Sequence, residues 1–118
     1  MTHLAEVRWL SLTDVADERG RLTAVEGERD VPFPIARVFY VHHVTPGIDR
    51  GGHAHCDTDQ VAVAAYGSLK VDVSDGVDTV SYTLTDPGRG LFLPRMLWVR
   101  LYGFTPGAVL LVFASTHY

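Results

Sequence analysis

Short runs of hydrophobic residues alternate with polar residues along this chain, and β-branched and aromatic side chains are frequent within the runs. No stretch keeps the period of an amphipathic helix for more than about two turns. Turn-forming sequences such as Asp75-Gly76 and Pro106-Gly107 separate the runs. The pattern therefore predicts an all-β protein. We expect strands over Val7–Leu12, Arg21–Val25, Ile35–His43, Gly51–His55, Gln60–Tyr66, Ser68–Ser74, Thr79–Thr83, Gly90–Leu93, Leu97–Tyr102 and Ala108–Ser115.

The segment Ser68–Thr83 is the clearest hairpin, because Asp75-Gly76 favours a tight turn between two alternating runs. Thr13–Asp17 is expected to form a helical turn at most. About ten short strands would leave many exposed edges, and closing the sheet on itself removes them. We therefore expect a single domain over residues 1–118, folded as a small antiparallel β-barrel or jelly roll.

The composition excludes several classes of protein. The chain is 47% hydrophobic and 20% charged, which is typical of a globular protein. No apolar run approaches the roughly 20 residues of a membrane helix. Ten basic and fourteen acidic residues give a net charge of −4, and the basic residues are scattered, so we do not expect nucleic-acid binding. Cys56 is the only cysteine and the N-terminal segment lacks a signal-peptide pattern, which favours a cytoplasmic location.

Candidate chemistry lies in the segment Arg50-Gly51-Gly52-His53-Ala54-His55. Residues two apart in a strand share a face, so His53 and His55 are expected to project side by side into the interior. The unperturbed pKa of histidine is about 6.5, so near neutral pH one imidazole can accept a proton while the other donates one. The pair therefore favours acid–base catalysis or ligand binding, with two buried structural histidines as the alternative.

The spacing of Gly47, His53, His55 and Gln60 resembles the first motif of the cupin superfamily, with Gln60 where metal-binding cupins usually carry Glu. In the second cupin motif the usual third histidine is replaced by Val99. Gln60 is a weak metal ligand and Val99 offers none, so we expect no metal cofactor. A metal site would require one more histidine, and the candidates are His42, His43 and His117.

Several further segments extend the resemblance over nearly the whole chain. They are Asp17–Gly20, Val31–Phe33, Arg37–Tyr40, Arg50–His55 with Gln60, and Gly90–Trp98. Together they resemble the nucleotide-sugar 3,4-ketoisomerases of the WxcM-like cupin family. Members of this family convert dTDP-4-keto-6-deoxyglucose to its 3-keto isomer without a metal, and they form dimers that exchange N-terminal strands. The resemblance implies the same reaction, a dTDP-sugar substrate and a homodimer for this chain.

The resemblance also implies roles for individual residues. His53 and His55 form the acid–base pair that moves a proton from C3 to C4 through an enediolate. Arg50 is expected to stabilise the enediolate or a phosphate oxygen, because its guanidinium is always charged. Further side chains are expected to bind the substrate, with Gln60 orienting a histidine or a sugar hydroxyl through its amide. These substrate-binding candidates are Arg19, Tyr40 and Gln60. The alternatives are an exposed position in a charged loop for Arg19, a solvent-facing turn for Arg50 and packing inside the barrel for Tyr40.

The segment after Trp98 departs from the family. The residues after Trp98 are usually His or Arg and then Glu, whereas Val99 and Arg100 follow here. Alternation predicts that Val99 points inward, while Trp98 and Arg100 face the other side of the sheet. The loss of a polar group at Val99 favours the competing interpretation of a metal-free cupin that binds a sugar nucleotide or small anion without converting it.

Overall fold

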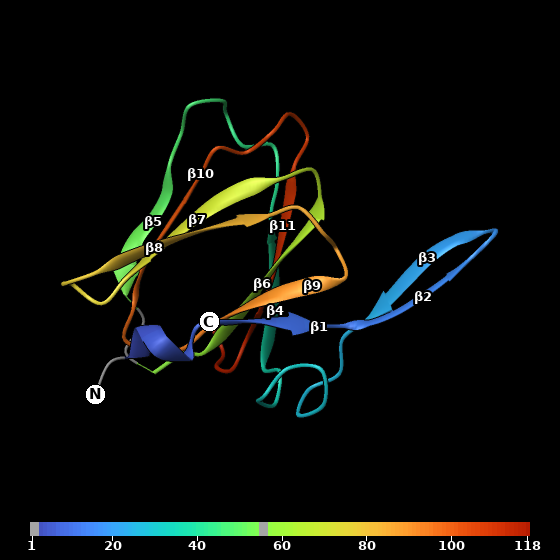
Figure 1. Ribbon diagram of the computed structural model, residues 1–118, viewed down its shortest axis with the longest axis horizontal. Coiled ribbons are helices and arrows are strands. Elements are labelled where there is room, and N and C mark those ends of the chain that lie inside the picture. Colours follow the sequence, from blue (N-terminus) through green and yellow to red (C-terminus); the bar gives the residue numbers. More distant parts are fainter. Residues whose placement is uncertain (1–2, 55–56) are drawn as a thin grey trace.

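The computed structural model describes the backbone of residues 3–54 and 57–118, and the side chains of all of these except residues 51–54 (Figure 1). A short 3-10 helix precedes a series of strands. The elements are η1 (His3–Glu6), β1 (Arg8–Ser11), β2 (Thr13–Asp17), β3 (Gly20–Ala24), β4 (Arg37–Val41), β5 (Arg50–Ala54), β6 (Gln60–Tyr66), β7 (Leu69–Ser74), β8 (Thr79–Leu84), β9 (Arg89–Leu93), β10 (Trp98–Tyr102) and β11 (Val109–Ala114). In this part of the chain, no helix has the length and apolar character needed to cross a membrane.

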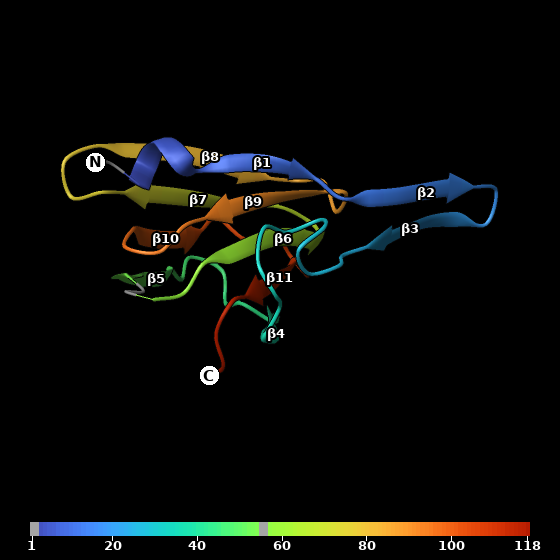
Figure 2. The same cartoon turned by 90° about the horizontal axis from the view of Figure 1, so that it is seen from below.

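The strands form two larger sheets and a separate hairpin. The five-stranded sheet has the order β1-β9-β6-β11-β4, and the four-stranded sheet has the order β5-β10-β7-β8. Figure 2 shows the strands of both sheets stacked in these orders. All pairings between named strands are antiparallel. This two-sheet arrangement confirms the predicted all-β jelly roll, although within the described residues the ladders do not join into a closed barrel.

The core between the two sheets is formed by aliphatic side chains that alternate with more exposed residues. On β7, Leu69, Val71 and Val73 are fully buried, whereas Lys70 is exposed. Leu110 on β11 belongs to the same cluster. Burying one such side chain stabilises the fold by about 1.5–3 kcal/mol relative to leaving it in water. The alternation thus holds the two sheets face to face.

Strand β6 is buried on both faces. Ala62 and Ala64 belong to the core between the sheets, whereas Val61 and Val63 belong to a second apolar cluster on the outer side of the five-stranded sheet. Residues 25–35 cover this second cluster, and Val31 and Phe33 are buried there. Burial on two sides explains why the sequence of β6 is a continuous hydrophobic run rather than an alternating one.

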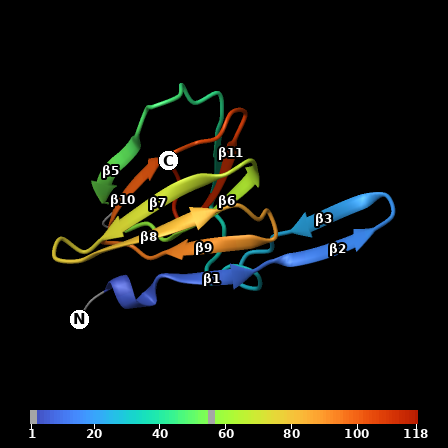
Figure 3. The ribbon, with the colours of Figure 1, turned by 45° about the horizontal axis from the view of Figure 1, so that its top comes forward.

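The β2–β3 hairpin extends away from the two sheets (Figure 3). Our prediction of at most a helical turn over Thr13–Asp17 was wrong, because this segment pairs with Gly20–Ala24 along its whole length. Gly20 adopts a φ of 131°, which glycine tolerates, and so lets the chain reverse after Glu18 and Arg19. Every residue of β2 is exposed, so the burial that would reveal a strand from alternation is absent.

Candidate active site

A cavity of about 130 Å³ lies between the two sheets. Both sheets contribute side chains to its wall, and most of these are apolar. Among the described side chains, Arg50 and Gln60 are the polar residues of the wall. A largely apolar cavity with a small number of converging polar groups is typical of a small-molecule site. The remaining lining residues are Phe39, Val41, Ala62, Leu93, Val99, Leu101, Leu110 and Val112.

A β-bulge in β5 sets which residues face this cavity. His53 pairs with Val99, but Arg100 pairs with Gly51, so Gly52 is the extra residue. In a regular strand, Arg50 and His53 would lie on opposite faces because they are three positions apart. The bulge instead pairs Arg50 with Leu101, two positions from Val99. Since Leu101 and Val99 both line the cavity, the register places positions 50 and 53 on its side of the sheet.

The predicted acid–base pair, His53 and His55, lies partly outside the described residues. The backbone of His53 lies in β5, whereas its side chain and the whole of His55 lie outside the described residues. Their shared face and their roles therefore remain predictions. The register of β5 with β10 supports the position of His53 beside the cavity.

Gln60 is the first residue of β6 and is buried in the cavity wall. The preceding residue, Asp59, anchors this point of the chain. Its carboxylate accepts hydrogen bonds from the Arg95 backbone N–H at 2.9 Å and from Arg95 Nη2 at 3.1 Å, and its backbone N–H donates to Ser115 Oγ at 2.9 Å. Partial burial raises the pKa of Asp59, but the hydrogen bonds and the charge of Arg95 outweigh this and lower it. Gln60 is therefore held in place by its neighbour.

The side chain of Val99 lines the cavity, as the alternation of β10 predicts. Trp98 is 51% exposed, and Arg100 forms ion pairs with Asp49 and Asp72. The cavity wall is thus apolar at position 99.

Tyr40 lies on the outer face of the five-stranded sheet, away from the cavity. It pairs with Leu111, whereas Phe39 and Val41, its neighbours on β4, line the cavity. The Tyr40 side chain is 63% exposed, and its ring stacks on that of His42 with 5.3 Å between centroids. Within one chain, Tyr40 is therefore not placed to bind a sugar in this cavity.

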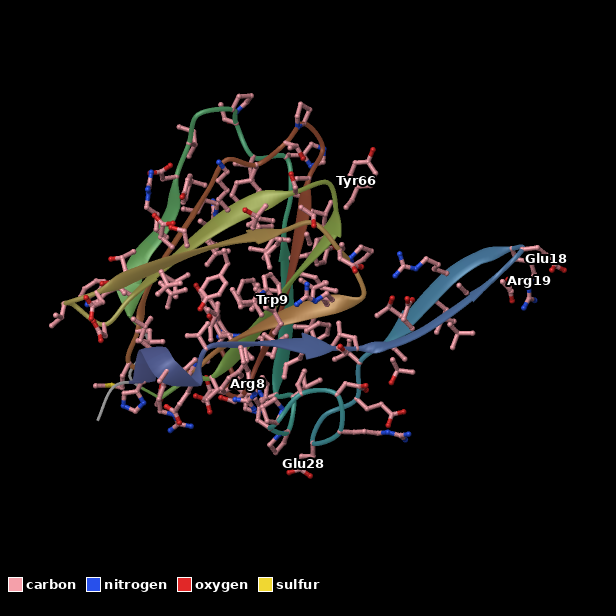
Figure 4. All side chains as sticks on the ribbon, in the orientation of Figure 1. Arg8, Trp9, Glu18, Arg19, Glu28 and Tyr66 are labelled. Carbon is pink, nitrogen blue, oxygen red and sulfur yellow. The ribbon has the colours of Figure 1, made fainter. Side chains whose placement is uncertain are left out.

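Arg19 is also distant from the cavity, at the far end of the β2–β3 hairpin (Figure 4). Its side chain is 86% exposed, and its Nη2 donates to Asp17 Oδ2 at 2.7 Å. This hydrogen bond lowers the pKa of the Asp17 carboxyl. The structure therefore brings Arg50 and Gln60 together but not Arg19 or Tyr40.

Arg37 was not singled out by the sequence analysis as a candidate site residue. It pairs with Ala114, which also pairs with Gln60, so all three residues lie in one row across the inner face of the sheet. Arg37 Nε is buried and has no hydrogen-bond partner among the described residues. Its guanidinium lies 5.4 Å from the ring centroid of Tyr118. The position of Arg37 in the same row as Gln60 is visible only once the register of β4 is known.

Of the three histidines considered above as further metal ligands, His42 and His43 contact each other. His42 Nδ1 and His43 Nδ1 are 2.5 Å apart on an exposed part of the chain. Over residues 3–54 and 57–118, no group of three or more His, Cys, Asp or Glu side chains is arranged to hold a metal ion.

Comparisons with known proteins agree with this geometry. The sequence model of the family described as "FdtA: WxcM-like, C-terminal" matches residues 5–118. A curated relative from Aneurinibacillus thermoaerophilus, TDP-4-oxo-6-deoxy-alpha-D-glucose-3,4-oxoisomerase, is 34% identical over 113 residues, which cover 96% of this chain and 81% of the relative.

Solved structures of similar proteins show the same fold. The sugar 3,4-ketoisomerase QdtA from Thermoanaerobacterium thermosaccharolyticum, in complex with TDP, is 38% identical with a TM-score of 0.94, covering 98% of this chain and 84% of QdtA. A QdtA variant with one histidine replaced by asparagine, in complex with TDP-4-keto-6-deoxyglucose, has a TM-score of 0.93 at 38% identity, covering 95% and 81% of the two chains. This chain therefore belongs to the WxcM-like cupin family of sugar 3,4-ketoisomerases.

Proposed function

We propose that this protein converts dTDP-4-keto-6-deoxyglucose to a dTDP-3-keto-6-deoxyhexose by histidine acid–base catalysis. The observation that carries the proposal is the bulge in β5, through which positions 50 and 53 pair with Leu101 and Val99, two residues that line the apolar cavity. The similarity to a curated 3,4-oxoisomerase over 96% of the chain supports the reaction and the substrate.

The reaction moves one hydrogen from C3 to C4 and needs no external oxidant. One imidazole of the His53 and His55 pair takes the proton from C3, and the electrons form a C3–C4 double bond while the C4 carbonyl oxygen becomes an enediolate oxygen. The second imidazole returns a proton at C4. The C3 hydroxyl loses its proton and becomes the new carbonyl, and the C4 oxygen gains one. General acid–base groups of this kind contribute about 10²–10⁴-fold to the rate.

Arg50 and Gln60 assist this step from the cavity wall. The negative charge of the enediolate develops in a largely apolar space, where a guanidinium stabilises it more strongly than it would in water. Arg50 is therefore the residue proposed to stabilise the intermediate or a neighbouring phosphate oxygen. The buried amide of Gln60 is proposed to orient a sugar hydroxyl or an imidazole.

The size of the cavity limits what it can hold. Its volume of about 130 Å³ is below the roughly 300–1,000 Å³ of pockets that enclose a drug-sized ligand. The sugar ring is therefore proposed to enter the cavity, while the nucleoside diphosphate stays outside. Arg50 both lines the cavity and is exposed, so its guanidinium is available to the sugar and to the diphosphate.

A homodimer with exchanged N-terminal hairpins is part of the proposal. A two-stranded hairpin is marginally stable alone in water, and β2–β3 exposes Val15 and Leu22 opposite each other. Packing the hairpin on a second subunit would bury both side chains. It would also carry Arg19 away from its own cavity and toward the partner subunit, which accounts for its predicted role in substrate binding.

The decisive experiment is incubation with dTDP-4-keto-6-deoxyglucose in D₂O in the presence of EDTA, followed by NMR. We expect loss of the C3 proton signal and formation of the 3-keto sugar at an unchanged rate with and without EDTA. Binding of the sugar nucleotide without exchange at C3 would instead support a non-catalytic binding protein. Activity that disappears with EDTA and returns with a divalent metal would contradict the acid–base mechanism.

A further inference from the structure

We propose that Asp49 and Arg100 are positioning residues for Arg50: their ion pair, on the face of the four-stranded sheet opposite the cavity, fixes the start of β5 so that Arg50 is presented to the substrate. This inference rests on the proposed function, because it assigns a purpose to Arg50 in the isomerisation. Neither residue contacts the cavity occupant, and both act through Arg50.

Strand β5 needs such support because of its place in the sheet. It is an edge strand whose only neighbour among the described residues is β10, and the bulge at Gly52 interrupts their ladder. Figure 1 shows β5 at the margin of the molecule beside β10. Among the described side chains, none forms a hydrogen bond or ion pair with the Arg50 guanidinium. The position of Arg50 therefore depends on how firmly its backbone is held.

Arg100 is itself held firmly on the outer face. Its Nη1 donates to Asp72 Oδ2 at 3.3 Å, and its guanidinium lies 4.0 Å from the centroid of the Tyr102 ring. Asp72 Oδ1 accepts from Ser81 Oγ at 2.7 Å and from Tyr102 Oη at 2.8 Å. Burial raises the pKa of Asp72, but these hydrogen bonds and the charge of Arg100 lower it overall, so the carboxylate stays ionised.

A second donor of Arg100 reaches across to the residue before Arg50. Arg100 Nε donates to Asp49 Oδ2 at 2.8 Å. Arg100 pairs with Gly51, so Asp49 is its diagonal neighbour, within reach of a long side chain. Successive residues of an extended chain point to opposite faces. Holding Asp49 on the outer face therefore directs Arg50 to the cavity face, where it is found.

The pair is too exposed to matter mainly for global stability. The side chains of Arg100 and Asp49 are 49% and 52% exposed, and ion pairs with this exposure contribute little to the free energy of unfolding. The ion pair is expected to act locally. It keeps the backbone of β5 ordered and thereby places the guanidinium of Arg50.

The test uses Asp49→Ala, Asp49→Glu and Arg50→Gln in the full-length protein. In Asp49→Ala we expect backbone amides of Arg50–Ala54 to exchange about tenfold faster, with the core strands unchanged. We also expect kcat/KM to fall about tenfold, and Asp49→Glu to recover most of it. The control is Arg29→Ala, which removes an exposed ion pair with Glu26 at 3.6 Å and should change neither measurement.

A double-variant cycle separates positioning from an independent effect. If Asp49 acts through Arg50, Asp49→Ala causes no further loss of kcat/KM in the Arg50→Gln background. The same tenfold loss in that background would overturn the proposal, and so would unchanged amide exchange in β5 or unchanged turnover despite faster exchange. A wild-type protein that does not isomerise the sugar contradicts the proposed function instead, and amide exchange, which needs no substrate, then still decides whether the ion pair holds β5.

Discussion

The two histidines of the His-x-His segment are expected to divide the proton transfer at the level of single residues. We predict that His53→Asn and His55→Asn each lower kcat by about 10² or more, because each removes a general acid or base while leaving a polar side chain of smaller size. His117→Asn, near the C-terminus, is the matched control. Turnover is measured by NMR and folding by circular dichroism. Near-normal rates in both variants would show that the pair is structural.

Residue spacing identified site residues where the proposed chemistry requires a fixed spacing. It did not identify them where the two faces of a strand have similar side chains. The segment Arg50–His55 and Gln60 could be identified from spacing alone, and the structure places Arg50 and Gln60 at one cavity. Tyr40 could not be placed, because both faces of β4 are apolar and the sequence does not say which one meets the interior. The pairing of β4 with β11 decides this, and it turns Phe39 inward.

The ion pair between Asp59 and Arg95 makes the start of β6 sensitive to acid. The pKa of Asp59 is lowered in the folded protein, so its stabilising contribution is present above the unfolded value of about 3.9 and is lost as the pH falls through the lower folded value. We predict that Asp59→Asn lowers the free energy of unfolding by about 1 kcal/mol at neutral pH. Urea unfolding at neutral pH and below about pH 3.5 measures the difference, which should shrink in acid.

The control for this pH dependence is Glu28→Gln, an exposed carboxylate outside the named strands. It should lower the unfolding free energy little at either pH. A difference between wild type and Asp59→Asn that persists unchanged in acid would mean that the charge of Asp59 is not what anchors β6.

At the scale of elements, the burial of a strand largely determined whether it could be predicted from the sequence. The ten predicted strands correspond to β1 and β3–β11, because most of them present strand-forming side chains between clear turns. Their ends differ by at most two residues from the prediction, and the predicted end at His55 lies outside the described residues. Strand β2 was missed because Thr13–Asp17 has no buried residue and contains two aspartates. Its strand conformation depends on pairing with β3, which alternation does not encode.

At the scale of the whole molecule, the projecting β2–β3 hairpin is the basis for predicting a homodimer with exchanged hairpins. If Val15 and Leu22 are buried against a second subunit, replacing both with lysine places charges in an apolar interface, and we predict that the dimer dissociates at micromolar concentration. Sedimentation velocity measures the oligomeric state. Val77→Lys is the control, because Val77 is 88% exposed in the β7–β8 turn. A wild-type protein that is monomeric at this concentration would rule out the exchanged dimer.

The two-sheet architecture itself could be predicted from the count of strands and turns, whereas the projection of the hairpin could not. Short alternating runs have to cover one another to bury their apolar faces, so a β-sandwich or barrel follows from the pattern. A hairpin with no fully buried residue gives no such signal, and its place becomes clear only from the three-dimensional arrangement.

The bulge at Gly52 also bears on solubility. An edge strand presents unpaired N–H and C=O groups that can recruit a strand from another molecule, and natural proteins prevent this with bulges, charges and residues of low strand propensity. Strand β5 has all three, since it begins with Arg50, continues with Gly51 and Gly52, and loses its regular register at that point. The irregularity that sets the cavity face of β5 therefore also protects the open edge of the sheet against aggregation.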